Sequence, residues 1–131
     1  MRVLLDTHAA VWAWIAPNRL SDEAAALMED TRNELLFSQV STWEICLKHH
    51  IGKLPLPEPP PSYLPARIQE FGLTYVPIQD VHLFRTTQLP QFHRDPFDWL
   101  LIATAQVLQV PILTADPHLA RYPVETVACG R

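Results

Sequence analysis

The chain has 131 residues, of which 48% are apolar and 18% are charged, so it can fold as one domain that buries roughly two-thirds of its unfolded surface. A net charge of −4 and a pI of about 5.8 exclude a globally basic nucleic-acid-binding face. The apolar run Ala9–Ala16 is too short to span a bilayer, and Asp6 interrupts the start where a signal peptide needs its apolar core. Cys46 and Cys129 lack metal-type spacing. We therefore expect one cytoplasmic domain over residues 1–131 with no membrane association.

Predicted strands and helices alternate along the chain. Short apolar runs predict strands at 2–5, 34–38, 74–78, 110–114 and 124–128. Helical periodicity and capping residues predict helices at 7–16, 22–30, 40–54, 65–72, 79–90 and 95–108, with Gly52 placed to end the third. This alternation predicts an α/β fold with a mostly parallel central sheet that is covered on both faces.

A proline-rich segment separates the third and fourth predicted helices. Six prolines fall within the twelve residues Leu54–Pro65. Proline lacks a backbone N–H and disrupts both helix interiors and central strands, so we expect an extended connector over the surface. A proline-rich ligand for another domain is the alternative interpretation.

Four acidic residues lie where predicted strands end or helices begin. Asp6 and Asp116 follow strands, whereas Glu44 and Asp98 lie in the first turns of helices. The carboxyl ends of parallel strands and the helix starts after them gather at one edge of an α/β sheet, where ligands bind. We therefore expect these four side chains to converge.

Each acid also has a purely structural interpretation, which stays open. Ser41 and Glu44 have the spacing of a capping box, and Asp95 is a candidate N-cap with Asp98 three residues later. Asp6 and Asp116 are N-cap candidates as well, and Pro117 is a typical first helical residue.

The predicted helix faces favour a functional interpretation. Asp98 heads an apolar stripe made of Leu101, Ile102, Ala105 and Leu108, and Glu44 shares a face with Leu47 and Ile51. We find no lysine or arginine on either stripe to pair with these acids, although a buried carboxylate needs a partner. Clustered carboxylates repel one another, and a hard divalent cation such as Mg²⁺ or Mn²⁺ relieves that repulsion. Zinc is less expected because the six histidines show no chelating pattern.

Four segments together resemble a known family. "LLDTHAAVWA", "SQVSTWEICLKHHIGKLPLP", "HRDPFDWLLIATA" and "ILTAD" are similar, in order and spacing, to the PIN-domain ribonucleases, above all to VapC-type toxins of bacterial toxin–antitoxin systems. The resemblance runs from Arg2 to Asp116. It implies a PIN-like α/β/α sandwich, an acidic pocket holding Mg²⁺ or Mn²⁺, and cleavage of RNA phosphodiester bonds. It also implies inhibition by a VapB-type antitoxin, and we expect a homodimer.

The resemblance assigns roles residue by residue. The family's four catalytic and metal-binding acids match Asp6, Glu44, Asp98 and Asp116. Three further residues match positions beside the pocket: Asp95, Thr7 and Thr114. Trp99 stands where relatives often carry arginine, so this chain lacks that guanidinium.

Other residues are candidates for RNA contacts. Lys48, Lys53, Arg85 and Arg94 could bind phosphates and supply a local basic rim, with plain surface solvation as the alternative. Trp12, Trp14 and Trp43 could stack bases, or could be buried in the core or in a dimer interface. His93 could lie near the pocket or simply in a solvated loop.

Three other functions compete with the ribonuclease interpretation. A phosphoacceptor receiver domain needs an aspartate ending the third strand and a lysine ending the last, but Asp80 comes too late and no lysine follows Leu113. A haloacid-dehalogenase-type phosphatase needs a second acid at position 8, which is His8. A toxin-like module that binds RNA or a protein partner without cleavage remains the alternative.

Overall fold

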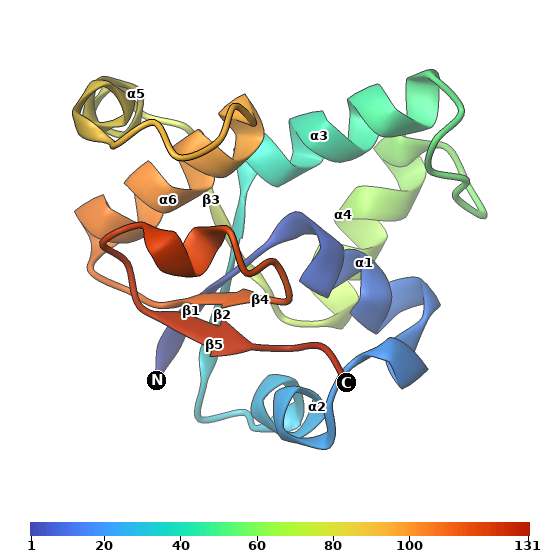
Figure 1. Cartoon of the computed structure of the whole chain (residues 1–131). Helices are drawn as coiled ribbons and strands as arrows, with labels where there is room; N and C mark the ends of the chain where they lie inside the picture. Colours follow the sequence, from blue (N-terminus) through green and yellow to red (C-terminus); the bar gives the residue numbers. More distant parts are fainter.

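Five short parallel strands form one sheet in the computed structural model, which describes residues 1–131 (Figure 1). The strand order is β3-β2-β1-β4-β5, and every pair of neighbouring strands is parallel. The strands are β1 (Arg2–Leu5), β2 (Glu34–Ser38), β3 (Thr74–Val76), β4 (Ile112–Thr114) and β5 (Thr126–Ala128). The predicted α/β class with a central parallel sheet is confirmed.

Six α-helices cover the sheet on both faces. They are α1 (Thr7–Ile15), α2 (Asp22–Glu29), α3 (Gln39–His50), α4 (Pro60–Glu70), α5 (Asp80–Arg85) and α6 (Pro96–Leu108). Helices α5 and α6 lie on one side of the sheet, and α1, α2 and α4 lie on the other (Figure 1). Short 3₁₀ turns follow α1, α5 and β4, at Pro17–Arg19, Thr86–Gln88 and Leu119–Arg121. None of the helices combines the length and apolarity needed to cross a membrane.

Alternation along the strands divides the buried side chains into two cores. In β1, Val3 and Leu5 pack with α1, α2 and α4, whereas Leu4 packs with α6. In β4, Leu113 and Ile112 divide in the same way. Both faces of a doubly covered sheet are apolar, which is why these strands read as continuous apolar runs in the sequence.

Most predicted boundaries shift by a few residues. The strands predicted at 74–78, 110–114 and 124–128 are each three residues long. The helix predicted at 40–54 ends at His50, and Gly52 follows with φ +79°, the left-handed conformation expected of a glycine just beyond a helix. The helix predicted at 79–90 divides into α5 and a 3₁₀ turn.

The expectation of an extended connector is wrong for its second half. Helix α4 begins at Pro60 and includes Pro65. Pro60 and Pro61 occupy the first turn, where no backbone N–H has an intrahelical partner. Tyr63 and Leu64 are buried in the core on that side of the sheet, and their packing outweighs the hydrogen bond that Pro65 cannot donate.

Candidate active site

Asp6 lies at the carboxyl end of β1 and caps α1. One of its carboxylate oxygens accepts a hydrogen bond from the Thr7 backbone N–H at 2.8 Å, and the other accepts one from the Thr114 hydroxyl at 2.7 Å. Thr114 ends the neighbouring strand β4, and its hydroxyl also accepts the Asp116 backbone N–H at 3.0 Å. The adjacent strand ends thus place three predicted site residues within hydrogen-bonding reach.

Helix α3 brings Glu44 to the same edge, but not through the predicted capping box. The N-cap is Ser38, because the helix begins at Gln39, so Ser41 lies inside the first turn. The buried Ser41 hydroxyl is 2.8 Å from that of Thr7, which ties α3 to α1. Glu44 is 5% exposed and lies one turn further along the helix.

Two expectations about the Glu44 face are wrong. Lys48, one turn after Glu44, forms an ion pair with its carboxylate, so the face does carry a cation. Leu47 and Ile51, predicted to share a buried stripe with Glu44, are exposed. A four-residue step places Lys48 directly above Glu44, whereas Leu47 is rotated toward solvent.

Asp95 and Asp98 differ in role at the start of α6. Asp95 is the N-cap, and one of its oxygens accepts backbone N–H groups from Phe97 at 2.9 Å and from Asp98 at 3.4 Å. The Asp98 side chain is turned inward and is 7% exposed. The stripe that it heads is buried as predicted at Leu101, Ile102 and Ala105.

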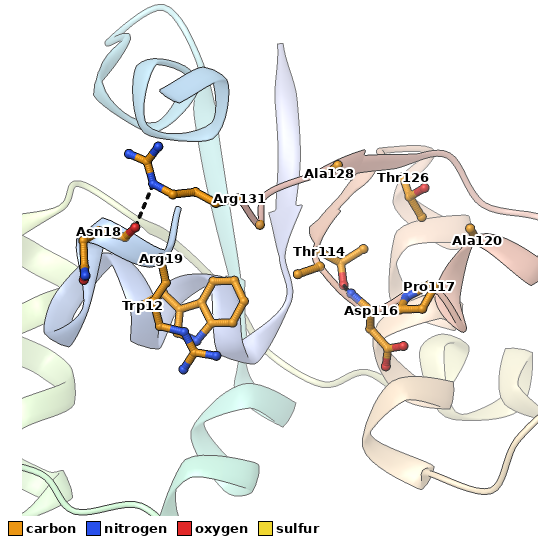
Figure 2. Close-up of a pocket in the computed structure, with 12 residues that line it drawn as sticks. Trp12, Asn18, Arg19, Thr114, Asp116, Pro117, Ala120, Thr126, Ala128 and Arg131 are labelled. Carbon is orange, nitrogen blue, oxygen red and sulfur yellow. Dashed lines mark hydrogen bonds between the residues drawn. The ribbon is translucent and has the colours of Figure 1, made fainter. Parts of the chain in front are cut away.

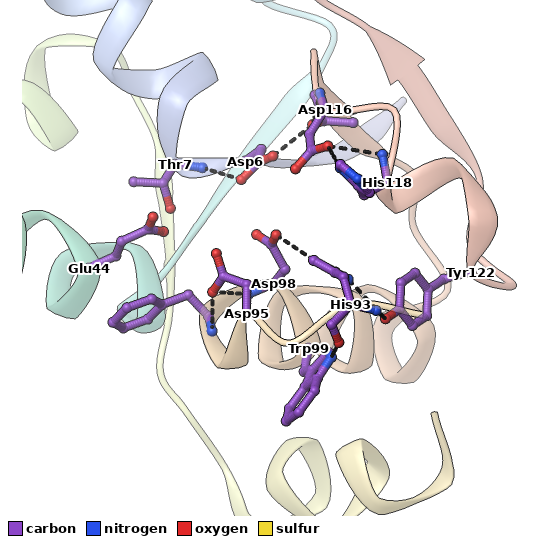
Figure 3. A network of polar contacts seen from close by, with 12 residues as sticks. Asp6, Thr7, Glu44, His93, Asp95, Asp98, Trp99, Asp116, His118 and Tyr122 are labelled. Atoms are coloured by element: carbon purple, nitrogen blue, oxygen red, sulfur yellow. Dashed lines mark hydrogen bonds and ion pairs between the residues drawn. The ribbon is translucent and has the colours of Figure 1, made fainter. Parts of the chain in front are cut away.

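These elements build one acidic pocket of about 210 Å³ (Figure 3). All four predicted acids line it together with Asp95, and their carboxylates point toward a shared space in Figure 3. The pocket is lined by Asp6, Thr7, His8, Val11, Glu44, Lys48, Leu54, Asp95, Asp98 and Asp116. The predicted convergence at the carboxyl ends of the strands therefore occurs.

Each of the four acids has its own basic neighbour. Glu44 pairs with Lys48, and the other three each contact a histidine. The ring nitrogen to carboxylate oxygen distances are 3.4 Å for His8–Asp6, 2.9 Å for His93–Asp98 and 2.9 Å for His118–Asp116. Sequence reasoning missed the roles of His8 and His118. Neither shows a chelating pattern, although both lie two residues after a predicted site acid.

His93 is held from several sides. Its backbone N–H and its ring Nδ1 both contact the hydroxyl of the buried Tyr122, at 3.2 Å and 3.0 Å. The indole N–H of Trp99 donates to the His93 carbonyl at 2.9 Å. Trp99 thus anchors the loop whose His93 contacts Asp98.

Burial dominates the electrostatics of the pocket. Desolvation raises the pKa of Asp98 to about 7, and the nearby carboxylates of Asp6, Asp95 and Asp116 add to the rise while the His93 hydrogen bond opposes it. Burial likewise raises the pKa of Asp6 against the opposing effects of His8 and the Thr114 hydrogen bond. Burial acts to raise the pKa of Asp116, but hydrogen bonds from the His118 backbone and ring outweigh it, so that pKa is lowered. The pocket thus disfavours a full set of negative charges.

The donor set suits a hard divalent cation. Carboxylate oxygens are the ligands that Mg²⁺ and Mn²⁺ prefer, and a cation would relieve the repulsion that raises the pKa of Asp98. In their present rotamers, no three carboxylate, imidazole or thiol groups are close enough together to hold a metal ion. Although the four carboxylates face one space, each is paired with its own basic neighbour. Joint coordination of one metal ion therefore requires some of these side chains to rotate.

The predicted basic residues divide between the pocket and distant surfaces. Lys48 lines the pocket with its side chain 46% exposed. Arg94 lies in the exposed segment before Asp95, and Lys53 is exposed beyond the end of α3. Arg85 hydrogen-bonds Gln106 and Gln88 near the far end of α6, so the structure does not bring it to the acids.

The chain matches the family model described as "PIN domain" over residues 3–125, which includes all four acids and the whole sheet except its last strand. The chain belongs to the PIN domain family. Among curated proteins, it is 39% identical over 61 residues to Ribonuclease VapC16 of Mycobacterium tuberculosis. That alignment covers 47% of this chain and 43% of the relative, so less than half of the relative's length is matched.

Solved structures with the same fold include a toxin–antitoxin complex and two proteins bound to DNA fragments. The chain superposes on one chain of the structure of VapBC2 from Rickettsia felis bound to a promoter DNA fragment. The TM-score is 0.73 and the identity 17%, and the match covers 98% of this chain and 99% of that one. A toxin–antitoxin complex from Klebsiella pneumoniae gives 0.62 and 18%, covering 95% of each chain. A chain of FitAB bound to an IR36 DNA fragment gives a TM-score of 0.60 and an identity of 16%, covering 98% of this chain and 94% of that one. Because all three identities are below 20%, these superpositions establish a shared fold and nothing about activity.

Proposed function

We propose that this PIN domain is a divalent-metal-dependent endoribonuclease of the VapC toxin type, which hydrolyses phosphodiester bonds of RNA. The observation that carries the proposal is the convergence of Asp6, Glu44, Asp98 and Asp116 on one pocket at the carboxyl ends of the strands. Membership of the PIN family and the ribonuclease name of the M. tuberculosis relative support the same chemistry.

The four acids are the proposed ligands of Mg²⁺ or Mn²⁺. When bound, the ion would polarise a phosphoryl oxygen and increase the acidity of a water molecule. Thr114 fixes the Asp6 carboxylate, and Asp95 fixes the helix start that presents Asp98. Thr7 links α1 to α3 through Ser41 and thereby helps to position Glu44. Lys48 lines the pocket, and its ammonium group could release the Glu44 carboxylate and bind a substrate phosphate instead.

We further propose an antitoxin partner and a homodimer. Structures of the same fold come from toxin–antitoxin complexes, which supports a VapB-type protein as the partner. Large apolar side chains stay exposed on α3 and α5, which both contact α6. They are Trp43 and Leu47 on α3, Ile51 at its C-terminal end, and Val81, Leu83 and Phe84 on α5. An RNA substrate and such a partner accord with the cytoplasmic location expected from the sequence.

One observation favours a second candidate function, binding without cleavage. Each acid already has a basic neighbour, and no three potential ligands are grouped closely enough for a metal. A site whose acids are already paired in this way could bind RNA or a protein without chemistry.

Incubation of structured RNAs with Mg²⁺ or Mn²⁺ distinguishes the two candidates. We expect the wild type to cut at discrete positions, and Asp6→Asn and Asp98→Asn each to lose at least 100-fold in rate. The exposed Asp80, changed to Asn, is the matched control and should cleave like the wild type. Equal cleavage by all four proteins would indicate a contaminant, and intact RNA with retained binding would establish the non-cleaving alternative.

A further inference from the structure

A second pocket of about 700 Å³ adjoins the acidic pocket (Figure 2). Asp116 lines both pockets, and Thr114 lines the second pocket while its hydroxyl holds Asp6. Figure 2 shows Trp12 and Arg19 on one side of this space and Thr114 and Asp116 on the other. The second pocket thus borders the acidic pocket at Asp116, near the carboxyl end of β4.

Arg19 presents an uncommitted cation at this pocket. Its guanidinium lies over the Trp12 ring, 4.3 Å from the centroid, and it forms no ion pair with a carboxylate. The backbone is fixed as well, because Arg19 ends a 3₁₀ turn and its carbonyl accepts the Arg131 N–H at 3.3 Å. By contrast, the guanidinium of Arg131, which also lines the pocket, is committed to Asp22 and to the Asn18 carbonyl.

A guanidinium stacked on an indole has the chemistry of a platform for an unpaired base. Sites for single-stranded nucleic acid combine positive charge with flat groups on which bases stack, and arginine planes serve as such groups. The outward N–H groups of the same guanidinium can also bind a phosphate. A protein segment fits better elsewhere, because the apolar groove between α3 and α4 is lined by Leu64, Ile68 and prolines.

We propose that the Arg19–Trp12 pocket is a subsite for one unpaired nucleotide next to the phosphodiester bond that is cut. This inference rests on the proposed ribonuclease function, and it restricts the substrate to RNA that is single-stranded beside the cleavage site. Arg19 stacks on the base or contacts its phosphate, while Asp116 marks the border with the acidic pocket. The subsite supplies a local positive charge that the net charge of −4 does not suggest.

Binding of a short fluorescent RNA strand, measured by anisotropy with Ca²⁺ and with intact RNA verified on a gel, tests the subsite. We expect Arg19→Gln to weaken binding about five- to tenfold, a loss in the range of one stacked base, and to reduce the salt dependence by about one ion. Arg19→Lys should lie between the two, because it keeps the charge and loses the plane. When the same strand is annealed into a duplex, its affinity for Arg19→Gln should differ less than twofold from its affinity for the wild type.

Arg32→Gln is the control, since it removes the same charge from an exposed residue just before β2, at the opposite edge of the sheet. It should bind within twofold of the wild type. Binding of the strand by Arg19→Gln with wild-type affinity would overturn the subsite, and so would an equal loss of affinity for the strand and for the duplex. If Arg19→Gln both binds and cleaves RNA normally, the subsite fails and the ribonuclease stands. If neither the wild type nor any variant cleaves RNA but Arg19→Gln loses affinity for the strand, the ribonuclease fails, and the pocket binds an unpaired nucleotide without adjoining a cleaved bond.

Discussion

Asp95 and Asp98 lie within one turn of α6 but have opposite surroundings. Asp95 uses its carboxylate to satisfy two backbone N–H groups at the helix start, where negative charge is favourable. Asp98 is buried among like charges, and its pKa of about 7 records the cost of ionising it there. Asp95 therefore stabilises the helix start, whereas Asp98 is the proposed metal ligand.

Substitution should separate the two roles. Asp95→Ala removes the cap, so we expect the free energy of unfolding to fall by about 1 kcal/mol while Mn²⁺ affinity stays within threefold. Asp98→Asn removes a repelled buried charge, so melting in the presence of a chelator should occur at a higher temperature while Mn²⁺ affinity falls. Chemical denaturation and calorimetric Mn²⁺ titration measure both effects, with Asp80→Ala as control. The opposite pattern, with Mn²⁺ affinity lost in Asp95→Ala and kept in Asp98→Asn, would contradict these assignments.

Strands and helices that carry a clear local signal could be predicted from the sequence. The apolar run of β1 and the Asp95 cap of α6 specify their own conformation, so the positions of Asp6 and Asp98 followed. Only the second half of helix α4 could be predicted, as part of the helix expected at 65–72. Its first half could not, because tertiary burial of Tyr63 and Leu64 overrides the local cost of Pro65.

The acids of the site could be predicted because each is attached to a strand end or helix start. Their partners could not be predicted in the same way. His118 is in the turn after β4, and Tyr122 meets His93 across 29 residues of sequence. No periodicity relates such loop residues to the pocket. The Glu44–Lys48 pair, by contrast, follows the ordinary four-residue helix spacing and was overlooked.

Helix α5 should make the fold sensitive to acid through His82. This side chain is buried, its Nδ1 accepts the Gln79 N–H at 3.2 Å, and desolvation lowers its pKa below the usual 6.5. The unfolded chain then binds the proton more readily, so the contribution of His82 is present above pH 6.5 and is lost as the pH falls through that value.

We expect His82→Gln, which keeps a hydrogen-bond acceptor, to lose less unfolding free energy than the wild type between pH 7.5 and about pH 5.5. Urea denaturation at both pH values measures this difference. The variant comparison isolates His82 from Asp6 and Asp98, whose raised pKa values act in the opposite direction. The exposed His50, changed to Gln, should behave like the wild type. A pH response in His82→Gln equal to that of the wild type would refute the role of His82.

At the scale of the whole molecule, charge and apolar surface are distributed unevenly. Acids concentrate at the carboxyl edge of the sheet, and Arg19 lines the second pocket, which shares Asp116 with the acidic one. Exposed apolar side chains concentrate on α3 and α5, with Phe84 at 68% exposure the most exposed of them. Such a surface is typical of a protein interface, which supports the proposed homodimer.

Phe84→Glu should therefore shift the chain from dimer to monomer, because it places a charge in the proposed interface. Light scattering after size-exclusion chromatography measures the mass, and the melting temperature of the monomer confirms that it is folded. Ile15→Glu, at an exposed apolar position on α1, is the control and should stay dimeric. A wild type that is monomeric at every concentration, or a dimeric Phe84→Glu, would exclude this interface.

The dependence of the RNA cleavage rate on Mn²⁺ concentration, compared between wild type and Asp98→Asn, tests the central claim most directly. A site built on Asp6, Glu44, Asp98 and Asp116 predicts no cleavage in chelator and saturation with Mn²⁺ in the wild type. The variant should need at least tenfold more Mn²⁺ and should reach a much lower maximal rate. Cleavage that persists in chelator, or identical Mn²⁺ curves for the two proteins, would contradict metal-dependent catalysis in the acidic pocket.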